Sequence, residues 1–339
     1  MRLALRHRAA FAGVAIGLTV GALSPAASAS PSPAPVPGLP GVVRLPVSDA
    51  ESDAALKYWT QARMDSAVPA DLPEQTSTPA TGRMKQGGGP STRTNVRTSA
   101  PPAAPTAITA KERSWPTNGI PTVGALFFNV GPIHQRCTGT VVNTPKGNII
   151  ATAAHCIWRK DVGIPHPNPN PVFVPGYYSG HSPYGKWAVK SRYITTEWHN
   201  HFNPDHDFGF MVMKPNHGKN LQPLLGANGW KTSDQYYQNY VEITGYPGNR
   251  NRPYQCYTHT RQAKNYIWQL VFGCDNYHEG VSGSLLMLDF HTTGPLRNLG
   301  TAMASLGGYK EGGTSDNTSY AVIWNHATAV LLDAAVRKQ

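Results

Sequence analysis

The sequence predicts an all-β fold, and two observations lead to this prediction. Residues 114–339 consist of short apolar or alternating runs separated by turn residues, as strands of a sandwich or of barrels do. The runs cover 123–130, 139–142, 148–152, 187–195, 208–213, 240–244, 266–272, 284–289, 299–305 and 320–324. In addition, only 14% of the 339 residues are charged, and 33 glycines and 30 prolines favour turns over long helices.

The first 29 residues have the features of a secretory signal. Arg2, Arg6 and Arg8 precede an apolar run over 9–23, and Ala27-Ser28-Ala29 follows as a small-residue cleavage site. The apolar run is too short to remain as a membrane span. We therefore expect an exported chain without a membrane anchor, and the cysteines between 137 and 274 fit an oxidising compartment.

Residues 30–113 combine two biased tracts with one predicted helix. Proline, alanine and serine dominate 30–45, and 70–110 has almost no large apolar side chains, so both tracts are expected to be disordered. Between them, Ser48 and Glu51 form a capping box that opens a helix near 48–67, and Pro69 ends it. A helix this short needs a partner surface to be stable. It therefore either docks on the rest of the chain or serves as a spacer.

The net charge of +11 is spread along the chain. No run of lysine and arginine is dense enough to predict a nucleic-acid site, so we expect no nucleic-acid partner.

The stretch from Cys137 to Cys156, CTGTVVNTPKGNIIATAAHC, predicts a β-hairpin. A β-branched run over 140–142 turns through 143–147 and returns over 149–152. The returning strand ends at His155, which is therefore held at the end of a rigid element, as a general base requires. The alternative is a structural histidine.

An aspartate opens the apolar run 208–213. Burying the Asp207 carboxylate is costly without a partner, and an imidazolium would supply one. Asp205 is the rival, but His206 follows it and does not begin a buried strand; a strand-start cap is the other alternative for Asp207. His199, His201 and His206 crowd this loop with spacings that do not match helical zinc sites, so no metal is expected.

The third motif is Gly280-Val281-Ser282-Gly283. Serine becomes a nucleophile when a base takes its proton. A glycine two residues earlier lets the backbone direct two N–H groups at one point, as oxyanion stabilisation requires. An ordinary tight turn would have the same sequence.

Together these motifs resemble those of the chymotrypsin-like (trypsin-fold) serine peptidases. The resemblance rests on CTGT with TAAHC, on the strand that follows Asp207 and on Gly-x-Ser-Gly, which occur in the family's order His, Asp, Ser. Gly-Val-Ser-Gly-Ser is similar to the bacterial secreted branch of glutamyl endopeptidases. The resemblance implies two antiparallel six-stranded β-barrels over about 115–225 and 235–325, a short C-terminal helix over 327–338, and a mostly disordered N-terminal leader.

The same resemblance implies the site and the organisation of the chain. His155, Asp207 and Ser282 would be catalytic, the amides of Gly280 and Ser282 would form the oxyanion hole, and neither metal nor cofactor is needed. Four cysteines allow three pairings. The resemblance of the first pair implies Cys137 with Cys156, and therefore Cys256 with Cys274.

We accordingly expect a signal peptide over 1–29, a propeptide over 30–113 and a peptidase domain over 114–339. The expected protein is a secreted serine endopeptidase made as a precursor, a monomer whose partners are a protein or peptide substrate and its own propeptide. Lys111 and Arg113, just before Ser114, mark a candidate processing site. A weak or inactive peptide-binding protein on the same scaffold is the alternative, and an esterase is a third.

The sequence departs from the family at the residue before the nucleophile. Val281 replaces the aspartate that, in the animal enzymes, pairs with the amino terminus freed on activation, so that ion pair cannot form. Substrate contacts are expected from Asn276, Tyr277, Ala304, Ser305 and Gly307. These residues favour neither an acidic nor a basic substrate side chain, although Asp275 would restore a basic preference if the loop shifted by one residue.

Overall fold

The structure is a computed structural model that describes residues 34–35, 41–70, 112–159, 166–248, 250–264, 266–277, 279–313 and 318–339. The predicted signal peptide and the disorder predicted for 71–110 lie outside the described residues. Contacts divide the chain into two units, Met1–Ser30 and Pro31–Gln339, and all of the described residues belong to the second unit.

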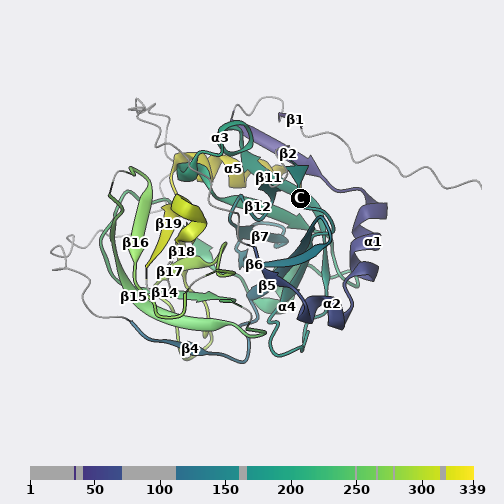
Figure 1. The fold of residues 1–339 in the computed structure, drawn as a ribbon, viewed down its shortest axis with the longest axis horizontal. Coiled ribbons are helices and arrows are strands. Elements are labelled where there is room, and N and C mark those ends of the chain that lie inside the picture. Colours follow the sequence, from purple (N-terminus) through teal and green to yellow (C-terminus); the bar gives the residue numbers. More distant parts are fainter. Residues whose placement is uncertain are drawn as a thin grey trace, which may run out of the picture. The chain divides into compact units, whose positions relative to one another are not determined.

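Six strands close the first barrel, drawn mainly in teal in Figure 1. Their order is β11-β10-β5-β6-β7-β12, and β12 pairs back with β11. All neighbours in this ring are antiparallel. The strands are β5 (Val123–Val130), β6 (Ile133–Val142), β7 (Ile149–Thr152), β10 (Val172–Pro175), β11 (Trp187–Thr195) and β12 (Gly209–Met213).

Six further strands close the second barrel, drawn in green and yellow. Their order is β18-β17-β14-β15-β16-β19, and β19 pairs back with β18. The strands are β14 (Gln238–Gly245), β15 (Tyr254–Gln262), β16 (Gln269–Phe272), β17 (Leu285–Leu288), β18 (Thr301–Leu306) and β19 (Ser319–Ile323). The two antiparallel six-stranded barrels confirm the predicted fold class.

Smaller elements complete the described part of the barrels. β4 (Ser114–Pro116) pairs with β15, β13 (Gly229–Trp230) pairs with β18, and β8 (Trp158–Arg159) pairs with β9 (His166–Pro167). The short helices are α3 (Thr196–His201), α4 (Leu221–Leu225) and the 3₁₀ turns η1 (Pro204–His206) and η2 (Tyr309–Gly312).

Two barrel strands were absent from the predicted runs. β15 places Cys256, Thr258 and Thr260 on its buried face, so its sequence has no hydrophobic alternation. β10 is a run of four buried residues that ends at Pro175, too short to stand out from a loop. Both strands are specified by their barrel neighbours rather than by local pattern.

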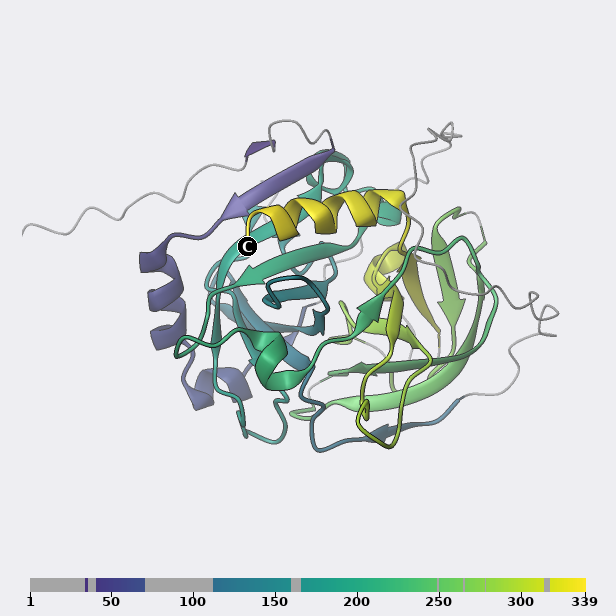
Figure 2. The ribbon, with the colours of Figure 1, turned by 180° about the vertical axis from the view of Figure 1, so that it is seen from behind.

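The C-terminal helix is present as α5 (His326–Arg337). The Asn325 side chain caps it by accepting from the Ala327 amide at 2.8 Å. Leu331 and Leu332 are buried in one cluster with Phe210 of β12, and Figure 2 shows α5 lying across β11 and β12. Within the residues that the structure describes, we find no helix with the length and apolar character of a membrane span.

The N-terminal stretch 41–70 is folded onto the first barrel. β2 (Val42–Pro46) pairs antiparallel with the C-terminal half of β11, from Thr195↔Val42 to Ser191↔Pro46. The sequence predicted a disordered leader up to about residue 45, and for 42–45 that was wrong. The strand's apolar side chains Val42, Val43 and Leu45 are buried against the barrel, and this tertiary contact decides their conformation. A two-residue strand, β1 (Ala34–Pro35), pairs with β2.

The predicted helix near 48–67 is divided into two. α1 (Asp49–Tyr58) begins with the expected capping box of Ser48 and Glu51, and α2 (Gln61–Asp65) begins at Thr60. Between them Trp59 is fully buried, and its indole N–H donates to the carbonyl oxygen of Asn170 at 2.7 Å. A buried aromatic ring removes roughly 200 Å² from water, which stabilises this packing by about 5 kcal/mol.

Candidate active site

His155 lies three residues after the end of β7, whose two neighbours hold the strand end in place. Thr152 of β7 pairs with Gly209 of β12, and Ala151 pairs with Thr140 of β6. The next residue, Cys156, is joined by a disulfide to Cys137 of β6, and Cys256 is joined to Cys274. These are the two pairings that the resemblance implied. His155 is fully buried, and its ring lies next to that of Trp198 with centroids 6.4 Å apart.

Asp207 faces His155 and accepts from it twice. Its Oδ2 lies 2.7 Å from His155 Nδ1, and its Oδ1 accepts from the backbone N–H of His155 at 2.9 Å. Both side chains are fully buried. The rival Asp205 is turned elsewhere: it accepts from Gln269 Nε2 at 2.8 Å, and burial raises the pKa of its carboxyl. Of the two aspartates, Asp207 is therefore the one that can hold the imidazole.

A pair of glycines after β18 completes the surroundings of Asp207. The backbone N–H of Gly308 donates to Asp207 Oδ2 at 2.9 Å. A side-chain carbon on Gly307 would lie 2.8 Å from the same oxygen, so only glycine leaves room for the carboxylate. The role of Gly308 was not predicted from the sequence, although a Gly-Gly pair directly after a buried strand could have indicated a close approach of the backbone to another group.

The turn around Ser282 is pinned by both barrels. The Ser282 carbonyl oxygen accepts from the amide of Thr138 on β6 at 2.8 Å, and the Gly283 amide donates to the carbonyl of Leu306 on β18 at 2.8 Å. Cys156 Sγ lies 3.9 Å from the Ser282 carbonyl oxygen. Ser282 therefore lies beside the segment that carries His155, and it is 5% exposed.

Two glycines in this turn have backbone conformations that exclude other residues. Gly280 has φ +91°, and a Cβ there would lie 2.5 Å from the carbonyl oxygen of Tyr246. Gly283 has φ +86°, and a Cβ there would overlap Thr152 and Thr138 of the first barrel. Side-chain-bearing residues are strained at such φ values. The Gly-x-Ser-Gly spacing thus follows from the turn's close contacts.

The solved structures similar to this chain include three serine proteases of the same architecture. The protease Anisep from Arthrobacter nicotinovorans is 22% identical with a TM-score of 0.57, covering 66% of this chain and 99% of that one. The thermostable serine protease AL20 from an extremophilic microorganism is 22% identical with a TM-score of 0.56, covering 65% and 98%. A Glu endopeptidase is 14% identical with a TM-score of 0.52, covering 68% and 100%.

The fold is that of the chymotrypsin-like serine peptidases. At these identities the likeness establishes the fold, as the sequence resemblance had implied. A scan of protein-family models finds no match, and a search of curated proteins finds no similar sequence.

Val281, which the sequence resemblance aligns with an ion-pairing aspartate of the animal enzymes, is an apolar core residue in this chain. Its side chain is 3% exposed and belongs to the core cluster of the second barrel. Its carbonyl accepts from the amide of Ser284 at 2.9 Å and from the Ser284 hydroxyl at 2.6 Å. Position 281 therefore stabilises the turn by apolar packing and by its backbone.

The loop that leads to Ser282 contains two of the predicted substrate-contacting residues. Asn276 is half-buried with φ +57°, and its Oδ1 accepts from Arg250 at 3.2 Å. Tyr277 is 1% exposed, and its hydroxyl reaches the carbonyl oxygens of Ile243 at 2.7 Å and Tyr254 at 2.6 Å. Burial raises its pKa well above the ordinary value. Tyr277 is thus an anchor of the loop, while Asn276 is nearer the surface.

Ala304 and Ser305 form part of the wall of the second barrel. Both are fully buried, and each pairs on both sides: Ala304 with Leu286 and Ile323, and Ser305 with Leu285 and Val322. The Ser305 hydroxyl accepts from the Trp324 indole at 3.3 Å. Neither residue has a backbone edge left for a substrate strand, so contacts on this side of the site are left to Gly307 and the residues after it.

The three crowded histidines have separate neighbours. His199 stacks on Trp158 with ring centroids 4.4 Å apart, His201 lies 3.5 Å from the Glu197 carboxylate, and His206 stacks on Phe208. Among the described residues, His155 with Cys137 and Cys156 is the group close enough to share a metal ion, but its two sulfurs are joined in the disulfide and are not thiolates.

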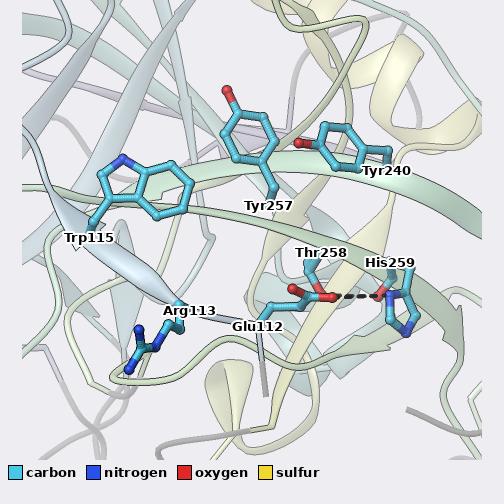
Figure 3. A pocket seen from close by; sticks show the side chains of 7 residues that line it. All are labelled: Glu112, Arg113, Trp115, Tyr240, Tyr257, Thr258 and His259. Carbon is cyan, nitrogen blue, oxygen red and sulfur yellow. Dashed lines mark hydrogen bonds and ion pairs between the residues drawn. The ribbon is translucent and has the colours of Figure 1, made fainter. Parts of the chain in front are cut away.

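A pocket of about 280 Å³ lies on the second barrel, between residues 112–115 and β15 (Figure 3). Trp115, Tyr257 and Tyr240 form a row of stacked rings along it, with centroids 5.6 and 5.0 Å apart. The Glu112 carboxylate lies 3.7 Å from His259 Nδ1. The pocket shares no residue with the His155, Asp207 and Ser282 constellation; its lining is Glu112, Arg113, Trp115, Tyr240, Tyr257, Thr258 and His259.

Proposed function

We propose that this chain is a secreted serine endopeptidase, made as a precursor, that hydrolyses peptide bonds through an acyl-enzyme. The observation that carries the proposal is the buried pair of His155 and Asp207 beside a tight serine turn that both barrels hold. The serine protease neighbours in fold support the same reaction class. The signal-like first 29 residues and the two disulfides support export.

Each of the three residues has a separate role in this mechanism. Asp207 holds the proton of His155 on Nδ1, which leaves Nε2 as the basic nitrogen. Nε2 takes the Ser282 proton as the hydroxyl oxygen attacks the substrate carbonyl, and returns it to the leaving amine. The amides of Gly280 and Ser282 stabilise the oxyanion, and water then hydrolyses the acyl-enzyme.

The precursor part of the proposal is supported by residues 68–70. β3 (Val68–Pro69) pairs parallel with Gln135 and Arg136 of β6, and the Ala70 amide donates to the Arg136 carbonyl at 3.0 Å. Pro69 Cβ lies 3.3 Å from the place where a Cβ on Gly280 would be. The uncut N-terminal stretch thus lies against the serine turn, where it would hinder a substrate.

Substrate preference is proposed only in part. Asn276, and the backbone of Gly307 and the residues after it, are the candidates for substrate contact, since the Tyr277 hydroxyl anchors the loop and Ala304 and Ser305 are paired on both sides. Although a Glu endopeptidase shares the fold, nothing in these residues selects an acidic side chain. The protein is proposed to act as a monomer on protein or peptide substrates.

A fluorophosphonate probe, which reacts with an activated serine, tests the proposal. The secreted, processed protein should be labelled on Ser282, and Ser282→Ala should abolish labelling, whereas the control Ser233→Ala in a partly exposed loop should not. Absence of labelling would overturn the proposal and favour a peptide-binding protein.

Labelled protein should next cleave an internal bond of a peptide blocked at both ends. Hydrolysis of ester substrates without cleavage of any such peptide would instead identify an esterase.

A further inference from the structure

Ser114 is bonded to Asp275 by both its backbone and its side chain. The Ser114 backbone N–H donates to Asp275 Oδ1 at 2.5 Å, and the Ser114 hydroxyl donates to the Asp275 carbonyl oxygen at 2.7 Å. In return the Asp275 amide donates to the Glu112 carbonyl at 2.9 Å. A carboxylate is therefore already positioned on the nitrogen atom of residue 114.

The neighbouring strand would keep Ser114 in this place if the chain were cut before it. β4 pairs with β15 through Ser114↔Cys256, Trp115↔Gln255 and Pro116↔Tyr254. The Trp115 ring lies beside that of Tyr257 (Figure 3), with an angle of 25° between the ring planes. These contacts all lie at or after residue 114, so they do not depend on residues 112–113.

The residue before this bond is accessible and basic. Arg113 is exposed, and its side chain extends away from the stacked rings (Figure 3). It provides the side chain that proteases cleaving after arginine recognise. Hydrolysis of the Arg113–Ser114 bond adds the hydroxyl of a water molecule to the Arg113 carbonyl carbon. The remaining hydrogen of the water molecule goes to the Ser114 nitrogen, which then takes up one further proton and becomes an ammonium group.

Asp275 stands at the base of the loop that ends in Ser282. It follows Cys274, which is fixed to Cys256 by the disulfide, and it precedes Asn276 and the buried anchor Tyr277. The other charged groups nearby are Glu112, Arg113 and His259 beside Ser114, and Arg250 on Asn276. A positive charge formed at Ser114 would thus hold the loop through Asp275, at the end of the loop that the disulfide fixes. Val281 has no charge with which to form such an ion pair.

We propose that the Arg113–Ser114 bond is the maturation cleavage site and that Asp275 binds the amino terminus released there. The proposal rests on the proposed function, since it supplies the activation step of that peptidase. The neutral amide gives the Asp275 carboxylate one hydrogen bond, whereas an ammonium group places a full positive charge opposite the carboxylate and adds two further N–H donors. The ion pair forms only after cleavage and holds the loop before Ser282.

The first test determines the terminus. The full-length chain is expressed with secretion, and the processed form should begin at Ser114 on N-terminal sequencing. Arg113→Gln should abolish this terminus, and the matched control Lys111→Gln should leave it unchanged. A processed form that starts at another residue, or an unchanged terminus in Arg113→Gln, would overturn the assignment.

The second test separates the ion pair from a merely structural aspartate. In the full-length Ser282→Ala chain, Asp275→Asn is compared before and after cutting with added trypsin. Asparagine still accepts from the neutral N–H, so the uncut chain should melt at nearly the same temperature. After cutting, the Asp275→Asn chain should melt about 5 °C below the cut chain that keeps Asp275, because the charged partner of the new amino terminus is lost.

Two results would refute the role of Asp275. The first is that Asp275→Asn lowers the melting temperature equally in the cut and uncut chains. The second is that the surface control Asp234→Asn lowers the melting temperature of the cut chain by the same amount. Trypsin that leaves the 113–114 bond intact would refute the cleavage site. None of these readouts needs catalysis by Ser282, so they remain decisive even if the fluorophosphonate test fails.

Discussion

Glu242 is a buried carboxyl group of β14, and its replacement by glutamine should change how the protein's stability depends on pH. The side chain is 2% exposed. Its Oε1 accepts from the Thr244 hydroxyl and from Gln255 Nε2, the latter at 2.8 Å. Burial, only partly offset by these two hydrogen bonds, raises the pKa of Glu242 from 4.5 to about 7.

The direction of the effect follows from the two pKa values. Below pH 4.5 the carboxyl group of Glu242 is protonated in both the folded and the unfolded chain, and its contribution to stability is fully present. Between 4.5 and about 7 the unfolded chain releases the proton while the folded chain keeps it, so stability falls as pH rises. With 1.36 kcal/mol for each pKa unit, the full loss is about 3 kcal/mol.

Unfolding by urea with the disulfides intact measures this loss. The Ser282→Ala background prevents self-digestion, and Glu242→Gln keeps an oxygen that accepts from Thr244 and Gln255. From about pH 5 to about pH 8 the free energy of unfolding of the glutamate form should fall, relative to the glutamine form, by most of about 3 kcal/mol. Parallel pH profiles for the two proteins would refute the burial argument.

Three further predictions concern the proposed active site and its cover. Asp207→Asn should lower kcat by a factor on the order of 10⁴, because an amide cannot both accept from His155 Nδ1 and keep the other two donors satisfied. The buried donor left unsatisfied should also lower the melting temperature by several degrees, on the order of 5 °C. Gly283→Ala should slow fluorophosphonate labelling by at least about 100-fold, which corresponds to roughly 3 kcal/mol of strain from overlap with Thr152 and Thr138. The control Gly294→Ala, also at positive φ but with nothing within 4 Å, should be labelled at the normal rate. Equal labelling rates for the two variants would contradict the reasoning. Ala70→Pro, in a chain left uncut by Arg113→Gln, should raise residual peptidase activity about fivefold by removing the hydrogen bond to Arg136, and unchanged activity would show that residues 68–70 do not cover the site.

Local sequence was sufficient where chemistry and conformation coincide in a few residues. The hairpin that ends at His155 and the choice of Asp207 over Asp205 could both be argued from neighbouring residues. The structure places His155 Nδ1 2.7 Å from Asp207 Oδ2. The tight turn around Ser282 was likewise indicated by its two glycines.

The remaining features depend on partners distant in the sequence. Residues 42–46 form a strand because β11 offers an unpaired edge, and nothing within the five residues indicates that edge. The position of Gly308 against Asp207 joins residues 101 apart in sequence. Ala304 and Ser305 are paired on both sides within β18, and the pattern Ser-x-Gly does not reveal how far this strand extends before it leaves the barrel.

The pairing of β2 with β11 has a consequence for any cut that separates residues 41–70 from the barrels. Cleavage alone would not remove this segment, since Val42, Val43, Leu45, Trp59 and Met64 stay buried against the first barrel. Two chains would remain together, and onset of activity would depend on the rate at which the shorter one dissociates or is digested. Its departure would open a sheet edge on β11 to solvent, and such an edge can recruit another strand. The proposed maturation step would then also be the step at which the protein is most prone to aggregate.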